Sequence, residues 1–200
     1  MIQMTWRDRA VSFAFAYADF TWSAEEKNIF HGYDPDGVLV NTPDAGYESA
    51  IVGRGWWRAG EVGRGVPYDW GGASSLSDFE MGIREGKYAG NVPDSRENGI
   101  SRHCVGVDCS GLVTVCWGMQ KKLSTRTIPL AADPLPSLDL LLPGDAILTT
   151  GHVFVFADFL DGLKTEATII EASRSAGRVR VRTVRIPDLA ASYVAYRKKE

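Results

Sequence analysis

The spacing of apolar residues changes from helical to strand-like toward the C-terminal part of the chain. An apolar run from Leu112 to Trp117 has helical spacing and is bounded by Gly118, which predicts a helix whose first turn carries Cys109. Period-two patterns then predict a hairpin across 140–156 and three more strands at 168–173, 178–185 and 193–196. Because an antiparallel sheet follows a helix, without alternating strands and helices, the α+β class is expected.

The N-terminal segment is interpreted as a buried amphipathic helix from about Thr5 to Phe20, capped by Thr5 and Asp8. The alternative is an export signal, in which two arginines within Met1–Arg9 precede an apolar stretch and Ala16–Ala18 has the form of a cleavage site. The short apolar stretch and its polar residues favour the helix.

Residues 1–200 are expected to form one domain, with an N-terminal extension over 1–65 and a core over 66–200. Residues 31–45 are rich in Gly, Pro, Asp and Asn, which predicts a loop. The polar stretch 73–103 is interpreted as a surface insertion that holds a short helix over 77–86.

Composition removes several classes of function. The chain has 200 residues and a net charge of −3, and its basic residues are scattered, so no nucleic-acid partner is expected. Arg178–Arg182 alternates basic and apolar residues, which predicts a strand with one solvated face. No apolar stretch reaches the length of a membrane span.

The spacing of the three cysteines matches neither a disulfide framework nor a zinc site, and Cys116 is expected to be a small buried apolar residue. Neither a metal nor a cofactor is predicted.

Cys109 is the candidate nucleophile. The first turn of a predicted helix carries this residue, and the unpaired N–H groups and positive dipole end of a helix N-terminus favour a thiolate over a thiol. A thiolate beside an imidazolium is the usual form of a nucleophilic cysteine.

His152 and Glu171 are the candidate partners of this cysteine. A histidine at the start of a strand is more often structural when it has no partner. Glu171, however, interrupts an apolar strand, and a buried carboxylate there needs a partner such as an imidazole. The three residues would then serve as nucleophile, base and orienter. His31 and His103 have no recognisable partner motif and are not assigned to catalysis.

Tyr68 lies in a tight turn, Val66–Gly72, in which Pro67 and two glycines constrain the backbone. Such a turn can present a phenol to a cleft, although both Tyr68 and Trp70 can also simply fill the core.

These motifs, in this order, resemble the NlpC family of papain-like cysteine peptidases that act on bacterial cell-wall peptides. The resemblance spans residues 66–173 and rests on Pro-Tyr-x-Trp-Gly-Gly at 67–72, Asp-Cys-Ser-Gly at 108–111, Leu-x-Pro-Gly-Asp at 141–145, Gly-His-Val at 151–153 and Ile-Glu-Ala-Ser at 170–173.

The resemblance implies an NlpC-type fold, in which an antiparallel sheet packs on the helix that carries Cys109. It implies that Cys109 attacks an amide carbonyl, that His152 passes the proton to the leaving amine, and that Tyr68 lines the cleft and assists the oxyanion. It also implies that Asp108 and Ser110 hold the free amine of a peptidoglycan-type peptide, which the family typically cleaves between D-glutamate, through its side-chain carboxyl, and a diamino acid.

The chain departs from the family pattern in three places. Glu171 stands where the family commonly has His, Asn or Gln, the stretch between Gly72 and Asp108 is long, and residues 1–65 hold no recognisable wall-targeting domain. The family is usually exported, but the compartment and oligomeric state stay open here. Two rival functions also stay open: an amidase or acyltransferase acting on another amide or ester, and an inactive module that binds peptidoglycan peptides.

Overall fold

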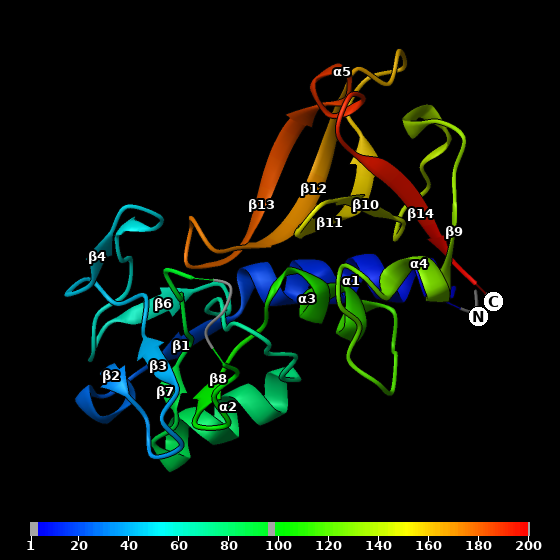
Figure 1. Cartoon of the computed structure of the whole chain (residues 1–200). Helices are drawn as coiled ribbons and strands as arrows, with labels where there is room; N and C mark the ends of the chain where they lie inside the picture. Colours follow the sequence, from blue (N-terminus) through cyan, green and yellow to red (C-terminus); the bar gives the residue numbers. More distant parts are fainter. Residues whose placement is uncertain (1–3, 96–98, 200) are drawn as a thin grey trace. The chain divides into compact units, whose positions relative to one another are not determined.

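The computed structural model describes residues 4–95 and 99–199 (Figure 1). These residues divide into two compact units. Unit 1 comprises 4–16, 109–171 and 181–199, and unit 2 comprises 17–95, 99–108 and 172–180. These limits differ from the expected boundary at residue 65. Residues 1–3, which belong to the alternative export signal, and residues 96–98 of the expected insertion lie outside the described part.

Unit 1 is built on a six-stranded sheet with the strand order β13-β12-β11-β10-β14-β9 (Figure 1). Its strands are β9 (Ala132–Pro134), β10 (Ala146–Thr149), β11 (His152–Phe159), β12 (Glu166–Ser173), β13 (Arg178–Arg185) and β14 (Val194–Lys198). The β10–β11, β11–β12, β10–β14 and β14–β9 pairs are antiparallel. The predicted hairpin and the three later strands are confirmed, while β9 formed where only a proline-rich loop was expected.

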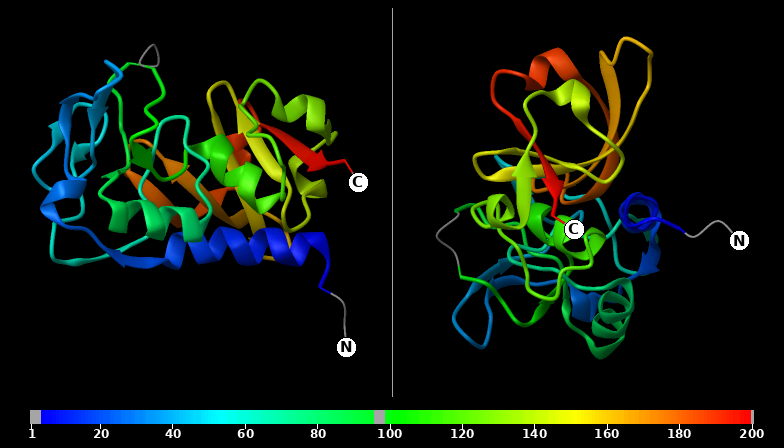
Figure 2. Two further views of the ribbon diagram at one scale, coloured as in Figure 1. Left: turned by 90° about the horizontal axis from the view of Figure 1, so that it is seen from below. Right: turned by 90° about the vertical axis from the view of Figure 1, so that its right-hand side faces the viewer.

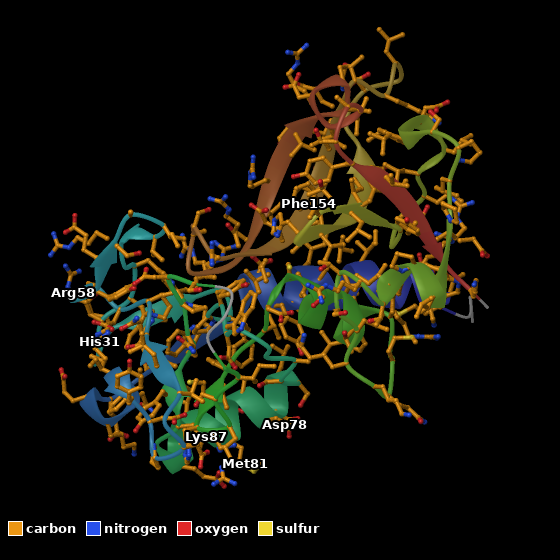
Figure 3. The ribbon with its side chains drawn as sticks, viewed as in Figure 1. His31, Arg58, Asp78, Met81, Lys87 and Phe154 are labelled. Carbon is orange, nitrogen blue, oxygen red and sulfur yellow. The ribbon has the colours of Figure 1, made fainter. Side chains whose placement is uncertain are left out.

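One face of this sheet carries the apolar core of unit 1. Because side chains alternate along a strand, Phe154 and Phe156 of β11 lie on the same face, with Ile169 of β12 opposite Phe156. All three are at most 3% exposed and belong to a cluster with Ile147, Leu189 and Ala195. Phe154 is labelled in Figure 3. Two residues of the candidate site, His152 and Glu171, lie on β11 and β12, which contribute to this core.

The helices of unit 1 are α1 (Trp6–Asp19, which ends in unit 2), α3 (Cys109–Cys116), α4 (Ile128–Ala131) and α5 (Ile186–Leu189), with the 3-10 helix η2 at Leu138–Leu140. Helix α3 packs against β11, and Figure 2 shows the helices and the sheet from two further directions. The predicted helices that begin near Thr5 and at Cys109 are both confirmed. Ala10 and Ala14 of α1 are fully buried, in agreement with the expected buried face.

A buried carboxylate ties α1 to the sheet of unit 1. Asp145 precedes β10, and its side chain is 0% exposed. It accepts hydrogen bonds from Arg7 of α1 at 2.8 Å and from Arg197 of β14 at 2.7 Å. Gly144, at φ +87°, allows the close approach, because a Cβ there would lie 3.3 Å from Cβ of Ala10. The Leu-x-Pro-Gly-Asp motif therefore has a structural function in this protein.

Unit 2 contains short strand pairs and one helix, α2 (Leu76–Glu85). Its strands are β1 (Thr21–Ser23), β2 (His31–Tyr33), β3 (Leu39–Asn41), β4 (Glu48–Ser49), β5 (Gly53–Arg54), β6 (Val62–Arg64), β7 (Tyr88–Ala89) and β8 (Cys104–Val105), with the 3-10 helix η1 at Glu26–Asn28. The strands pair as β1–β6, β2–β3, β4–β5 and, in parallel, β7–β8. The loop expected over 31–45 thus contains the small β2–β3 hairpin.

The segment expected to be a surface insertion contributes to the core of unit 2. Phe79 of α2 is fully buried, and its ring lies edge-on to Trp22 at 5.3 Å between centroids. Trp22 also contacts the rings of Trp56 and Trp57. The short helix expected over 77–86 is present as α2, and Ser75 caps it by accepting from the Asp78 N–H. The sequence thus predicted this helix, but the polar composition of 73–103 did not reveal that one face of the helix is buried.

The chain belongs to the α+β class, since antiparallel strand pairs and helices occur without a regular βαβ alternation. Within the residues that the structure describes, none of the helices has both the length and the apolar character needed to cross a membrane.

Candidate functional site

Cys109 is the first residue of α3, in unit 1. The helix is apolar, with Leu112, Val113 and Cys116 buried, so packing holds its N-terminus in place. Cys109 itself is 7% exposed. The sulfur therefore lies where helical N–H groups point outward and the helix dipole favours negative charge.

His152 is the first residue of β11, directly after the β10–β11 turn. Gly151 in that turn has φ +79°, a left-handed conformation that favours glycine. The His152 ring meets the edge of Phe154 at 4.9 Å between centroids, and its side chain stays 27% exposed. Strand pairing and an aromatic neighbour thus fix the ring while leaving it partly accessible.

Glu171 lies on β12, and its side chain is 2% exposed. Val155 pairs with Ile170, so extending the register places Phe154 opposite Glu171 and His152 diagonally across from it on the same face. Nε2 of His152 lies 2.8 Å from Oε2 of Glu171. Because a carboxylate only accepts, Nε2 carries the hydrogen. The expected pairing of these two residues is therefore present in the geometry.

Cys109 and Glu171 both affect the titration of His152. Burial by itself lowers the pKa of His152, but the interactions with Cys109 and Glu171 outweigh it and raise this pKa to about 9. An imidazolium therefore persists beside the sulfur at neutral pH, and such a cation favours the thiolate.

The other two cysteines differ from Cys109 in their surroundings. Cys104 lies on β8 of unit 2, and Cys116 lies on α3, two turns after Cys109. Burial raises the pKa of both thiols well above the ordinary range. Both therefore remain protonated at neutral pH, and the prediction that Cys116 is a small buried residue is confirmed by its 4% exposure.

Ser110 follows Cys109 on α3 and is 4% exposed. Its hydroxyl accepts from the Lys122 ammonium at 3.3 Å, and its carbonyl accepts from the Thr114 hydroxyl at 2.7 Å. A cation thus already occupies one position at the Ser110 hydroxyl. The expected contact between Ser110 and a substrate amine stays a prediction.

Tyr68 and Asp108 belong to unit 2. Tyr68 is 4% exposed, and its backbone N–H donates to the Gly177 carbonyl at 2.8 Å. The Asp108 carboxylate accepts from the Gly71 N–H at 3.0 Å, so it holds the glycine turn that follows Tyr68. Their expected roles in cleft and substrate binding stay predictions.

Arg182 was not singled out in the sequence. It lies on β13 in unit 1, and its Nη1 donates to Oε1 of Glu171 at 3.0 Å. The alternating pattern of Arg178–Arg182 predicted the strand correctly but assigned its arginines to a solvated face. The sequence signal for this contact was a buried acid, Glu171, followed by an arginine on a later strand. Their spacing in the sequence does not by itself show that they pair.

The remaining histidines lie in unit 2. Nε2 of His31, which Figure 3 labels, is 2.9 Å from Asp44, and Nε2 of His103 is 3.0 Å from Asp36. The His31 pair agrees with the hydrogen-bonding role expected in place of catalysis.

Asp34, Asp36 and His103 are the one group in the described part of the chain whose ligand atoms are close enough for a metal ion. The Asp34 oxygens accept from Val38 N–H and the Ser101 hydroxyl, while Arg102 pairs with Asp36 at 2.7 Å. Hydrogen bonds to Asp34 and the Arg102 charge beside Asp36 thus already engage these carboxylates.

No protein-family model, no curated protein and no solved structure matches this chain in the comparisons.

Proposed function

We propose that this protein is a papain-like cysteine peptidase or amidase of the NlpC type, acting on peptidoglycan-type peptides. The observation that supports the proposal most strongly is the hydrogen bond between His152 and the buried Glu171, on a sheet whose strand β11 packs against the helix that begins at Cys109. The ordered motifs across residues 66–173 support the same conclusion. The preferred bond, by resemblance, joins the side-chain carboxyl of D-glutamate to a diamino acid.

The proposed reaction has two halves. The Cys109 sulfur attacks the amide carbonyl, and the imidazolium of His152 gives its proton to the leaving amine as the C–N bond breaks, leaving a thioester. Neutral His152 then takes a proton from water, which attacks the thioester and releases the acid and the Cys109 thiolate, so the protonated His152 and the thiolate are restored. Glu171 keeps the ring oriented and stabilises its charged form throughout.

Cys109→Ala tests the nucleophile, with Cys116→Ala as a matched control on the same helix. A peptide containing D-glutamate linked through its side chain to diaminopimelate is incubated with each variant and followed by mass spectrometry. We expect Cys109→Ala to lower turnover by at least about 10⁴-fold and Cys116→Ala to retain most of it. Undiminished turnover by Cys109→Ala ends the proposal.

Alkylation by iodoacetamide tests the activated thiol without a substrate. The native protein is expected to gain one label, at Cys109, well below pH 8, because Cys104 and Cys116 are kept protonated by burial. Peptide mapping locates the label. Labelling that rises only at the pH of an ordinary free thiol contradicts the Cys109–His152 pair.

The rival functions predict different outcomes. An amidase or acyltransferase with another substrate shows the same alkylation but cleaves generic amides or esters better than muropeptides. An inactive binding module binds the peptide without a thioester and is unaffected by His152→Ala. The His152–Glu171 hydrogen bond, together with a cysteine at the start of the helix that packs against β11, favours an enzyme over the binding module.

A further inference from the structure

The two carboxylate oxygens of Glu171 have different partners. Oε2 faces Nε2 of His152 at 2.8 Å, and Oε1 faces Nη1 of Arg182 at 3.0 Å. The Glu171 side chain is 2% exposed, whereas the Arg182 side chain is 43% exposed. A carboxylate that is almost completely shielded from solvent thus lies between a titratable partner, His152, and a permanently charged partner, Arg182.

The two partners act on Glu171 at different stages of a reaction. When His152 gives up its proton, it stops being a cation, and a buried carboxylate with no other counterion would resist that transfer. Arg182 stays charged whatever the state of His152. Its charge therefore compensates Glu171 at the moment when the imidazole is neutral.

We propose that Arg182 is a positioning residue that holds Glu171 through one oxygen and weakens the attraction of that carboxylate for the protonated form of His152. The inference rests on the proposed function, because it explains how His152 can release a proton to a leaving amine. Arg182 acts only through Glu171, and neither substrate nor sulfur needs to touch it.

Cys109 and Glu171 both affect the titration of His152, and the Glu171 carboxylate on β12 lies 2.8 Å from its Nε2. Arg182, whose charge does not change, acts from β13 through Glu171. Tyr193, which follows α5, stacks on Phe154, and burial together with the negative charge of Glu171 raises its pKa, so it stays neutral in the range tested. Among these groups only Arg182 differs between the variants compared, so a shift in the titration of His152 reports on Arg182.

The test compares Arg182→Gln and Arg182→Lys with Arg185→Gln. Arg185 is a matched control on the same strand, since it is 66% exposed and lies 3.7 Å from the exposed Asp188. The titration of the His152 ring is followed by NMR in a Cys109→Ala background, where no turnover is needed. The pH profile of kcat is measured for the same substitutions in the protein that retains Cys109.

Arg182→Gln is expected to raise the titration midpoint of His152 by about half a pH unit to one unit and to lower kcat by about tenfold. Arg182→Lys keeps the charge but not the forked geometry, so it should restore the midpoint and part of kcat. Arg185→Gln should change neither. If Arg182→Gln leaves the titration midpoint of His152 unchanged, the inference is overturned, even if the melting temperature falls. An arginine with a purely structural role would lower stability without moving that midpoint.

The two proposals fail separately. If the protein hydrolyses no peptide but Arg182→Gln still moves the midpoint, the proposed function is wrong and the coupling stands. If hydrolysis depends on Cys109 while the midpoint is unmoved, Arg182 has no positioning role and the proposed function stands. An equal shift in Arg182→Lys and Arg182→Gln also overturns the inference, since charge would then not be the cause.

Discussion

Unit 1 buries two carboxylates against one sheet, and their partners differ. Asp145, at the start of β10, is bound on both oxygens by arginines, Arg7 and Arg197. Glu171, on β12, is bound by Arg182 on one oxygen and by His152 on the other. Both carboxylates are at most 2% exposed. The charge around Asp145 is the same at every ordinary pH, while the charge around Glu171 changes when His152 gains or loses a proton.

This difference distinguishes an ion pair that only stabilises the fold from a pair that can also transfer a proton. Arginine does not lose its proton in the working range of an enzyme, so the Asp145 cluster can only hold α1 and β14 to the sheet. An imidazole beside a buried carboxylate can both store and release a proton. Four substitutions or conditions test this contrast, with the largest expected effect first.

Glu171→Ala should lower kcat by about 10²- to 10⁴-fold, because His152 loses the acceptor that fixes its ring and supports its charge. The free energy of unfolding should be affected much less than kcat, since His152 and Arg182 are partly exposed and water can reach them. Steady-state hydrolysis and thermal melting measure the two effects. A variant with full turnover would show that Glu171 is structural, as Asp145 is.

Asp145→Ala should lower the free energy of unfolding by about 3 kcal/mol, because it leaves two arginines without their buried partner. Arg7 and Arg197 are 22% and 30% exposed, which places the loss toward the lower end for a broken buried pair. Urea unfolding gives the value. The folded fraction should keep its alkylation rate at Cys109, and a lost rate with unchanged stability would reverse the contrast.

Raising the pH should weaken the Glu171 pair and leave the Asp145 cluster intact. The pKa of His152 is raised to about 9 from an ordinary value of 6.5, so its stabilising contribution is full below about 6.5 and is lost as the pH rises through about 9. Hydrolysis should likewise decrease above pH 9, by about tenfold per unit, as the imidazolium disappears.

Unfolding measurements at pH 7 and pH 10, with and without His152→Gln, check the origin of this loss. The wild-type protein should lose stability between these pH values, and His152→Gln should lose little. Equal losses in both proteins would place the titrating group elsewhere.

Asp188→Ala should have the smallest effect, within about 0.5 kcal/mol in the free energy of unfolding. Asp188 pairs with Arg185 at 3.7 Å, and the two side chains are 64% and 66% exposed. Solvent screens such a pair, and no buried group loses a partner. Thermal melting checks the value, and a loss as large as that of Asp145→Ala would show that burial does not explain the contrast.

The local elements of unit 1 were largely predictable. The apolar spacing before Gly118 and the period-two pattern after residue 140 correctly predicted α3 and the strands β10 to β14, because each pattern reflects one buried face. Unit 2 was predicted less well. Its strands are two or three residues long, too short to show a period, and its core is a cluster of aromatic rings from separate segments.

The candidate site was predictable in part. Glu171 stood out because a charged residue in an apolar strand requires a partner, and the structure pairs it with His152 as expected. Arg182 did not stand out, because an arginine in an alternating strand is normally solvated. Asp145 was noted only as part of a motif, and its two arginines come from opposite ends of the chain.

Residue types and their local spacing thus predict the α+β class and the helix that carries Cys109, and they single out Cys109, His152 and Glu171 as candidate site residues. These properties follow from neighbours in the chain, whose side chains must share one face or one turn. The partners of each buried charge depend instead on strand order and register, which bring residues such as Arg182 and Glu171 together from β13 and β12. Local patterns do not encode that register, so folding alone determines which carboxylate receives two arginines and which shares a proton with histidine.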